Sequence, residues 1–158
     1  MLKKLREPKN SPVSKRIVSS IVAAIFDPLG LISPVVVVAY KIFLQQLWLH
    51  KLDWDDQLPS ELLNQWMDMY LCLSQVNEMA VERLVLAKGQ PTEIQLHGFC
   101  DSSEKAYGAR LYLRSVNQQG EVTTTLLCSK SGVAPVKKIT LPRLELCGAL
   151  LLALLSHK

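Results

Sequence analysis

The chain has 158 residues, of which 49% are hydrophobic and 20% are charged. This composition supplies enough apolar surface for a folded core and excludes an intrinsically disordered chain. The formal net charge of +4 is unevenly spread, because residues 1–16 hold six bases and one acid, whereas residues 17–90 hold four bases and eight acids. The basic N-terminal end suits a phosphate-rich partner and is equally consistent with a solvated tail.

The cysteines and the apolar stretches predict where the protein resides. The four cysteines occur singly, without a C-x-x-C pair, and the three histidines are too scattered for a zinc site. The longest apolar stretch, residues 29–40, is interrupted by Gly30 and Pro34, and a bilayer span needs about 20 apolar residues. No signal peptide precedes the first predicted helix. We therefore expect an intracellular, cytoplasmic protein that is neither secreted nor bound to a membrane.

The first half of the chain is predicted to be helical. Apolar residues at spacings of three and four predict a helix over residues 15–26, which ends at the Asp-Pro-Leu-Gly turn of residues 27–30. Ser33 and Pro34 are typical of a helix start and open a second helix that runs to about Lys51. A third helix begins near Pro59. We expect a basic segment over residues 1–13, a three-helix unit over 14–76 and a connector over 77–92.

After Pro91 the apolar period changes from helical spacing to two. Strands are predicted over residues 94–103, 106–113 and 121–130, and their short connections indicate an antiparallel meander. A leucine-rich helix follows from about Pro142 to Ser156. It is so apolar that only one side can pack on the sheet, so we expect an exposed apolar patch and a tendency to aggregate. The predicted fold class is α+β, with the sheet and last helix in residues 93–158.

Two carboxylates stand in contexts that suggest chemistry. Asp101 closes the first predicted strand, and Glu145 lies in what is predicted to be the first turn of the last helix. Taken alone, an Asp in such a context is more often a turn former than a metal ligand. A Glu in such a context is more often a helix-dipole partner than a catalytic residue. However, leucines surround Glu145 in a helix that we expect to be largely buried, and a buried carboxylate needs a partner or a metal. One acid at a strand end and one at a helix start, across a meander, is typical of a metal-dependent nuclease.

Four motifs occur in an order that resembles a known family. They are FDPLGLISP at 26–34, HGFCDSSEKAYGA at 97–109, KSGVAP at 130–135 and LPRLEL at 141–146. Together they resemble the Pol polyproteins of BEL/Pao retrotransposons over about residues 14–156. One mild departure is Asp101-Ser102-Ser103, where that family usually has Asp-Ala-Ser.

The resemblance implies a fold and a role for each half of the chain. Residues 14–76 would follow the reverse transcriptase palm as a thumb or connection, and residues 93–158 would begin an RNase H-like domain whose first strand is central. Asp101 would be the first metal-binding Asp of that domain and Glu145 the Glu of its first helix, with Mg²⁺ as the metal. The other two acids of the nuclease and the palm aspartates are not in this chain, which contains no Tyr-x-Asp-Asp.

The leading hypothesis is therefore a fragment of a retrotransposon Pol polyprotein that is inactive alone, because two carboxylates are too few to fix two magnesium ions. Its expected partners are the rest of the polyprotein, within retrotransposon particles, and weakly an RNA–DNA hybrid. The hybrid would contact basic residues near the two acids: Lys130, Lys137, Lys138 and Arg143.

Two other functions stay open. The first is a domesticated or remnant module that binds protein or nucleic acid. The second is an aspartic peptidase, against which Asp101-Ser102-Ser103 argues because it lacks the glycine of Asp-Ser-Gly or Asp-Thr-Gly.

Overall fold

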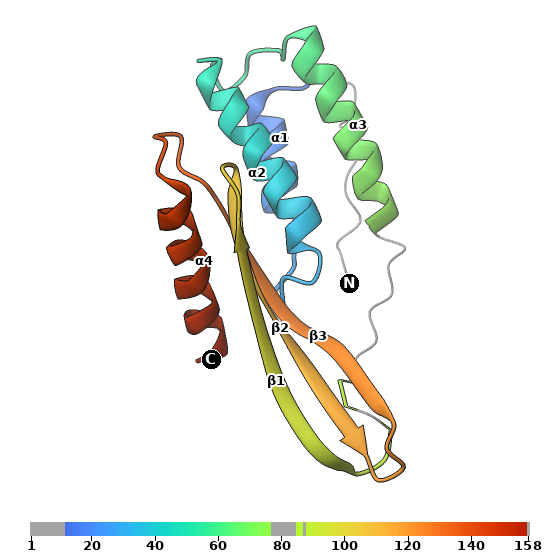
Figure 1. Cartoon of the computed structure of the whole chain (residues 1–158). Helices are drawn as coiled ribbons and strands as arrows, with labels where there is room; N and C mark the ends of the chain where they lie inside the picture. The colour runs from blue at the N-terminus through green and yellow to red at the C-terminus, as the bar shows by residue number, and fades with distance from the viewer. Residues whose placement is uncertain (1–11, 77–84, 87, 158) are drawn as a thin grey trace. The chain divides into compact units, whose positions relative to one another are not determined.

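The computed structural model describes residues 12–76, 85–86 and 88–157, with only the backbone for 33–39, 74 and 76. Four helices and a three-stranded antiparallel sheet form an α+β fold, as the sequence predicts (Figure 1). Two compact units share the chain. The helical unit comprises Met1–Pro28 and Val35–Ala80, and the sheet unit comprises Leu29–Pro34 and Val81–Lys158. No helix among the described residues is long and apolar enough to cross a membrane.

The helical unit contains α1 (Lys15–Ala23), α2 (Ser33–Leu49) and α3 (Ser60–Val76). Its core is an aromatic cluster around Trp66, which is fully buried. The Trp66 ring stacks on Phe43 and meets Tyr40 edge-on, with centroid distances of 5.8 Å in both pairs. Such pairs stabilise a fold beyond the area they bury. The three predicted helices are therefore confirmed, although α1 ends three residues earlier than predicted, before the Asp27-Pro28 turn.

The first turn of α1 is held by Trp48 near the end of α2 and by the loop between α2 and α3. The Lys15 side chain is buried, with its ammonium 4.0 Å from the centroid of the Trp48 ring and 5.4 Å from that of Trp54. Arg16 donates two hydrogen bonds to Asp55, at 2.6 and 2.9 Å, and the hydrogen bond from Arg16 lowers the pKa of that carboxyl. Lys15 and Arg16, two of the basic residues near the N-terminus, thus already have interaction partners within the helical unit.

The sheet unit is an antiparallel meander in the order β1-β2-β3. Its strands are β1 (Pro91–Ser102), β2 (Ala106–Asn117) and β3 (Val122–Val133), each longer than predicted. The Asn117 side chain organises the second hairpin, because its Oδ1 accepts the N–H groups of Gln119 and Glu121 at 3.0 and 2.9 Å. Within the described part of the chain β1 is an edge strand. The central position that the resemblance implied would require another strand on the free side of β1.

Helix α4 (Leu141–Ser156) packs on β1 and β2 and buries Leu144 (Figure 1). The approach to β1 depends on Gly98, where a Cβ would lie 2.8 Å from Cδ1 of Leu152. The outer side of α4 leaves a stripe of leucines exposed, at positions 146, 150 and 154. This is the unburied apolar side that the sequence predicts for the last helix.

A loop from before α2 covers the outer edge of β3. The backbone N–H of Ser129 donates to the carbonyl of Leu29 at 2.8 Å, and its hydroxyl donates to the carbonyl of Gly30. Gly30 has φ +69°, and a Cβ there would collide with the backbone carbonyl of Ser129. The sequence predicts the turn at residues 27–30 but places it in the helical unit, whereas Leu29–Pro34 packs with the sheet.

We predict that Gly30→Ala weakens the sheet unit more than Gly120→Ala does. Both glycines have positive φ, but only Gly30 lacks room for a Cβ, since nothing lies within 4 Å of the Cβ position at Gly120. Gly120→Ala should cost about 1 kcal/mol of unfolding free energy from backbone strain alone. Gly30→Ala should cost roughly 1–2 kcal/mol more, because the loop must leave Ser129 and both hydrogen bonds are lost. Urea unfolding measures the difference, and equal costs would show that the docked loop contributes nothing.

Candidate functional site

The end of β1 meets the first turns of α4. The hydroxyl of Ser102 donates a hydrogen bond to the carbonyl of Leu144 at 2.8 Å. Gly148 faces the same place, since a Cβ there would lie 3.0 Å from Oγ of Ser102 and 3.5 Å from the carbonyl oxygen of Asp101. The structure thus brings the backbone of Asp101 against the helix segment that carries Glu145.

The side chain of Asp101 leaves β1 on the other side from Ser102. Successive side chains of a strand alternate between faces, and Gly98 and Ser102 are the residues that face α4. The Asp101 carboxylate is exposed, and its Oδ1 accepts the N–H of Ser102 at 2.8 Å. A metal ion shared with Glu145 would therefore lie beside the end of β1 rather than over the face that α4 covers. Their joint ligation of a metal stays a prediction.

Glu145 differs from its predicted surroundings in two respects. The helix begins at Leu141 and has no acid in its first turn, so Glu145 lies in the second turn. Its side chain is exposed, as is that of Leu146. The expectation of a largely buried helix that forces a partner on this carboxylate is wrong, because α4 buries only the side that faces the sheet. Solvent access leaves Glu145 free to bind a cation but does not require it.

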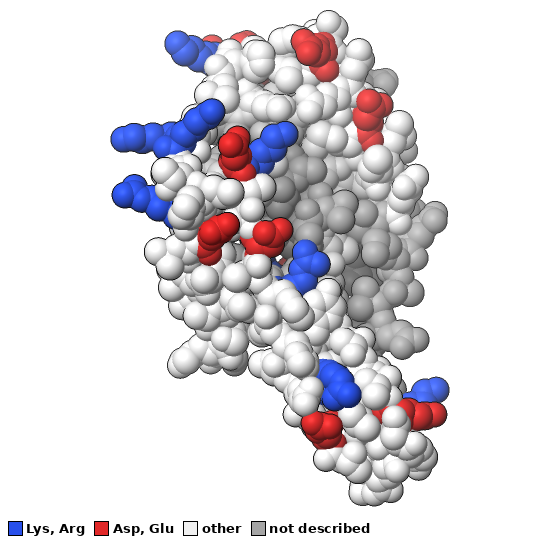
Figure 2. All heavy atoms as spheres, viewed as in Figure 1, with Lys and Arg blue, Asp and Glu red and all other residues white. Residues whose placement is uncertain are grey.

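The predicted nucleic-acid residues lie in one stretch from the end of β3 to the start of α4. Lys130, Lys137, Lys138 and Arg143 are all exposed. The basic N-terminal end was also expected to contact phosphates. Within it, Lys15 and Arg16 have partners in the helical unit, whereas Lys3, Lys4, Arg6 and Lys9 lie outside the described residues. On the face seen in Figure 2, basic and acidic side chains lie interspersed rather than in a patch of one sign.

The model of one protein family matches residues 14–158 of the chain, and its description is "Pao retrotransposon-like RNaseH-like domain". The chain belongs to this family. The match includes both the helical unit and the sheet unit, so the resemblance to a Pao retrotransposon Pol region is confirmed. No curated protein and no solved structure matches the chain.

The donor chemistry of this Pao RNaseH-like domain fits Mg²⁺ only in part. Asp101 and Glu145 offer hard carboxylate oxygens, which magnesium prefers, together with retained water. Within residues 12–76, 85–86 and 88–157, no group of three or more His, Cys, Asp and Glu could hold a metal ion. Two carboxylates can bind one hydrated ion weakly, and a fixed pair of ions would need further ligands.

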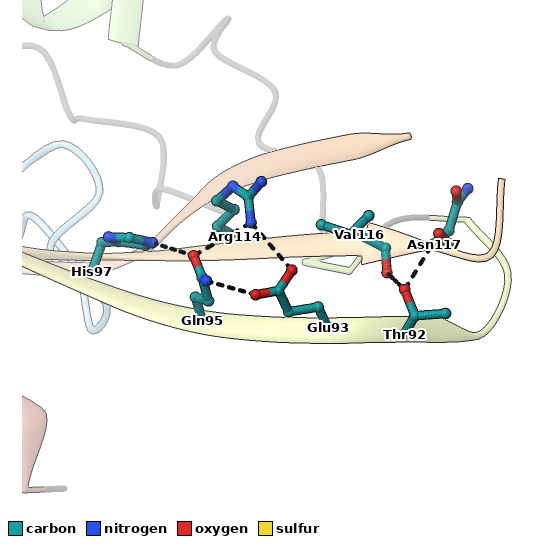
Figure 3. A network of polar contacts seen from close by, with 7 residues as sticks. All are labelled: Thr92, Glu93, Gln95, His97, Arg114, Val116 and Asn117. Atoms are coloured by element: carbon teal, nitrogen blue, oxygen red, sulfur yellow. Dashed lines mark hydrogen bonds and ion pairs between the residues drawn. The ribbon is translucent and has the colours of Figure 1, made fainter. Parts of the chain in front are cut away.

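The face of the sheet opposite α4 carries a polar network that the sequence analysis did not single out (Figure 3). The amide of Gln95 donates to Glu93 at 2.7 Å, and its oxygen lies 3.0 Å from the His97 ring and 3.3 Å from Arg114. Arg114 and Glu93 also form an ion pair at 3.8 Å. The sequence does contain a signal for this network. The period-two pattern of β1 assigns Glu93, Gln95 and His97 to one face of the strand.

We predict that Gly148→Ala destabilises the sheet unit although alanine favours helix. Alanine gains up to about 1 kcal/mol in helix propensity, but its Cβ would press on Oγ of Ser102, which its hydrogen bond to Leu144 holds in place. In a Ser102→Ala background the obstacle is absent, so Gly148→Ala should become neutral or stabilising. A double-mutant cycle of urea unfolding measures the coupling, expected at roughly 1 kcal/mol or more. Additive effects would mean that α4 does not press on the end of β1.

Proposed function

We propose that this chain is part of a Pao retrotransposon Pol protein in which Asp101 and Glu145 bind a magnesium ion at the end of β1. The observation that carries the proposal is the hydrogen bond from Ser102 to Leu144, because each of these residues adjoins one of the two acids. A strand end and a helix turn held together in this way keep the two backbone segments that carry these exposed carboxylates close together. Magnesium there would neutralise charge on a phosphodiester.

The site would be incomplete as a nuclease. Two-metal hydrolysis requires both ions to be fixed around the scissile phosphate, one to activate water and one to stabilise the leaving oxygen. Asp101 and Glu145 can hold one ion with few protein ligands, so its position would be poorly determined. We therefore propose that the 158-residue chain binds nucleic acid and metal but does not cleave an RNA–DNA hybrid.

The basic stretch from Lys130 to Arg143 would supply the phosphate contacts. It ends in the first turn of α4, within two residues of Glu145 in the sequence. Phosphate contacts position a nucleic acid without reading its sequence. Binding would then be weak and indifferent to sequence, and the helical unit would serve as a connection to the reverse transcriptase part of the protein.

A binding module without catalysis is the second candidate. It is favoured by the exposed leucine stripe at positions 146, 150 and 154, since such a stripe on a soluble domain marks a contact surface. The two candidates differ in whether the acids bind metal, which the following measurement decides.

We predict that Mn²⁺, used as a paramagnetic substitute for Mg²⁺, broadens the backbone amide NMR signals around Asp101 and Glu145 first. Excess Mg²⁺ should reverse the broadening. Asp101→Asn and Glu145→Gln should each abolish it, because each removes half of the ligand charge. Asp68→Asn, an exposed acid on α3, is the matched control and should leave it unchanged.

The same variants distinguish metal binding from nuclease chemistry. The 158-residue chain should not cleave a labelled RNA–DNA hybrid in Mg²⁺. If it does, the proposal of an incomplete site is wrong. If Asp101→Asn leaves the broadening intact, Asp101 is not a ligand and the binding-module candidate replaces the metal site.

We predict that affinity for an RNA–DNA hybrid falls steeply with salt, through release of counterions from the phosphates. The double variant Lys137→Ala/Lys138→Ala should lower the slope of log Kd against log salt by about 2, one for each lost phosphate contact. The exposed pair Lys41 and Lys51 in the helical unit provides the control double variant, which should leave the slope unchanged. Fluorescence anisotropy at several salt concentrations measures the slopes. Binding that ignores salt would remove nucleic acid from the partners.

A further inference from the structure

The loop at Leu29–Pro34 lies between two helices of the helical unit in the sequence, yet it belongs to the sheet unit. The chain leaves the helical unit after Pro28 and returns to it at Val35. Helix α2 begins at Ser33, so its first two residues cluster with the sheet unit and its later turns with the helical unit. One continuous helix therefore carries the chain from one unit into the other.

The loop and the helix that follows it are each anchored by specific contacts. Ser129 on β3 is buried and donates hydrogen bonds to the carbonyls of Leu29 and Gly30. Tyr40 on α2 is buried and meets the ring of Trp66 edge-on, which places it in the core of the helical unit. Tyr40 lies about 10 Å along the helix from its first residue. A hydrogen-bonded helix of this length is stiff, so it can transmit the loss of either anchor to the other.

The docked loop does not depend on what pairs with β1. Strand β3 lies on the other side of β2 in the sheet, and the loop, α2 and β3 all lie within the matched residues 14–158. The helical unit also needs support from outside its own core. A unit of about 60 residues is only marginally stable by itself, and α1, with nine residues, is too short to be stable as an isolated helix.

We propose that the loop at Leu29–Pro34 is a latch that makes the helical unit and the sheet unit unfold together. Unfolding of the sheet removes Ser129 as the anchor of the loop, which releases the start of α2 and weakens the core around Trp66. The coupling acts in both directions, because a coupling free energy is reciprocal. A ligand that binds one folded unit would thereby stabilise the other. Without the latch, the connector over residues 77–92 would leave each unit to unfold by itself.

The first test follows the two units separately during urea unfolding of the full 158-residue chain. All tryptophans lie in the helical unit, so tryptophan fluorescence reports that unit: Trp48, Trp54 and Trp66. Backbone amide NMR signals of β2 report the sheet, and the two probes should give one midpoint in the wild type. Leu144→Ala removes a buried side chain from the sheet unit. It should lower both midpoints together, by roughly 1 M urea or more.

Gly30→Ala should break this response, because a Cβ at residue 30 collides with Ser129. In that background the two midpoints should separate, and Leu144→Ala should then lower only the NMR midpoint. Gly120→Ala is the matched control, since Gly120 also has positive φ but has nothing within 4 Å of its Cβ position. The midpoints should stay together in Gly120→Ala. Leu144→Val provides a milder change where Leu144→Ala leaves no folded sheet.

The second test cuts the mechanical connection and leaves the docked loop unchanged. A Gly-Ser-Gly-Ser insertion after Ile32 separates the loop from the start of α2 and should also separate the two midpoints. The same insertion after Gly89, which is exposed in the connector, is the control and should leave the midpoints together. Different midpoints in the wild type, or a fluorescence midpoint that does not respond to Leu144 substitution, overturn the proposal. Midpoints that stay together in Gly30→Ala or in the Ile32 insertion also overturn it.

Discussion

The close approach of α4 to β1 is the constraint on which the candidate site depends. Two glycines permit it, Gly98 on the strand and Gly148 on the helix, since a Cβ at either position would press on a neighbouring side chain. Protein interiors are packed too tightly to absorb such an atom without displacement. The hydrogen bond from Ser102 to Leu144 then fixes the helix along the strand. With that geometry, the backbone that carries Asp101 and the helix turn that carries Glu145 share one end of the sheet.

The same packing explains why much of α4 stays exposed. A helix on one face of a three-stranded sheet can bury only one side, and the side that carries Leu144 is the one that faces the sheet. A helix in which ten of sixteen residues are leucine or alanine therefore has an apolar surface left over. Glu145 lies in this exposed environment, so the chemistry of the site rests on accessible carboxylates rather than on a buried charge.

The loop at residues 29–34 gives the FDPLGLISP motif a physical role. Its Leu-Gly segment supplies two carbonyl acceptors to Ser129, and the left-handed backbone of Gly30 lets it approach the strand closely. This motif lies far from the acids in the sequence, and its contacts are made with an edge of the sheet. Its role in the fold is thus to cover the outer edge of β3.

The sequence by itself determined the elements of this protein. Helical spacing, the Ser-Pro helix start and the change to a period of two are local signals, and they predict three helices, a meander and a final helix with boundaries within a few residues. Family membership was also readable, because the motifs are long and ordered along the chain.

Only the tertiary structure decided how these elements expose their residues. The solvent access of Glu145, the direction of Asp101, the engagement of Lys15 and Arg16, and the docking of Gly30 on Ser129 each depend on contacts between segments distant in sequence. Local patterns set backbone conformation through steric preference and hydrogen bonding within a few residues. Burial and pairing are instead set by which surfaces meet. In this chain such contacts join residues up to 100 positions apart, as between Leu29 and Ser129.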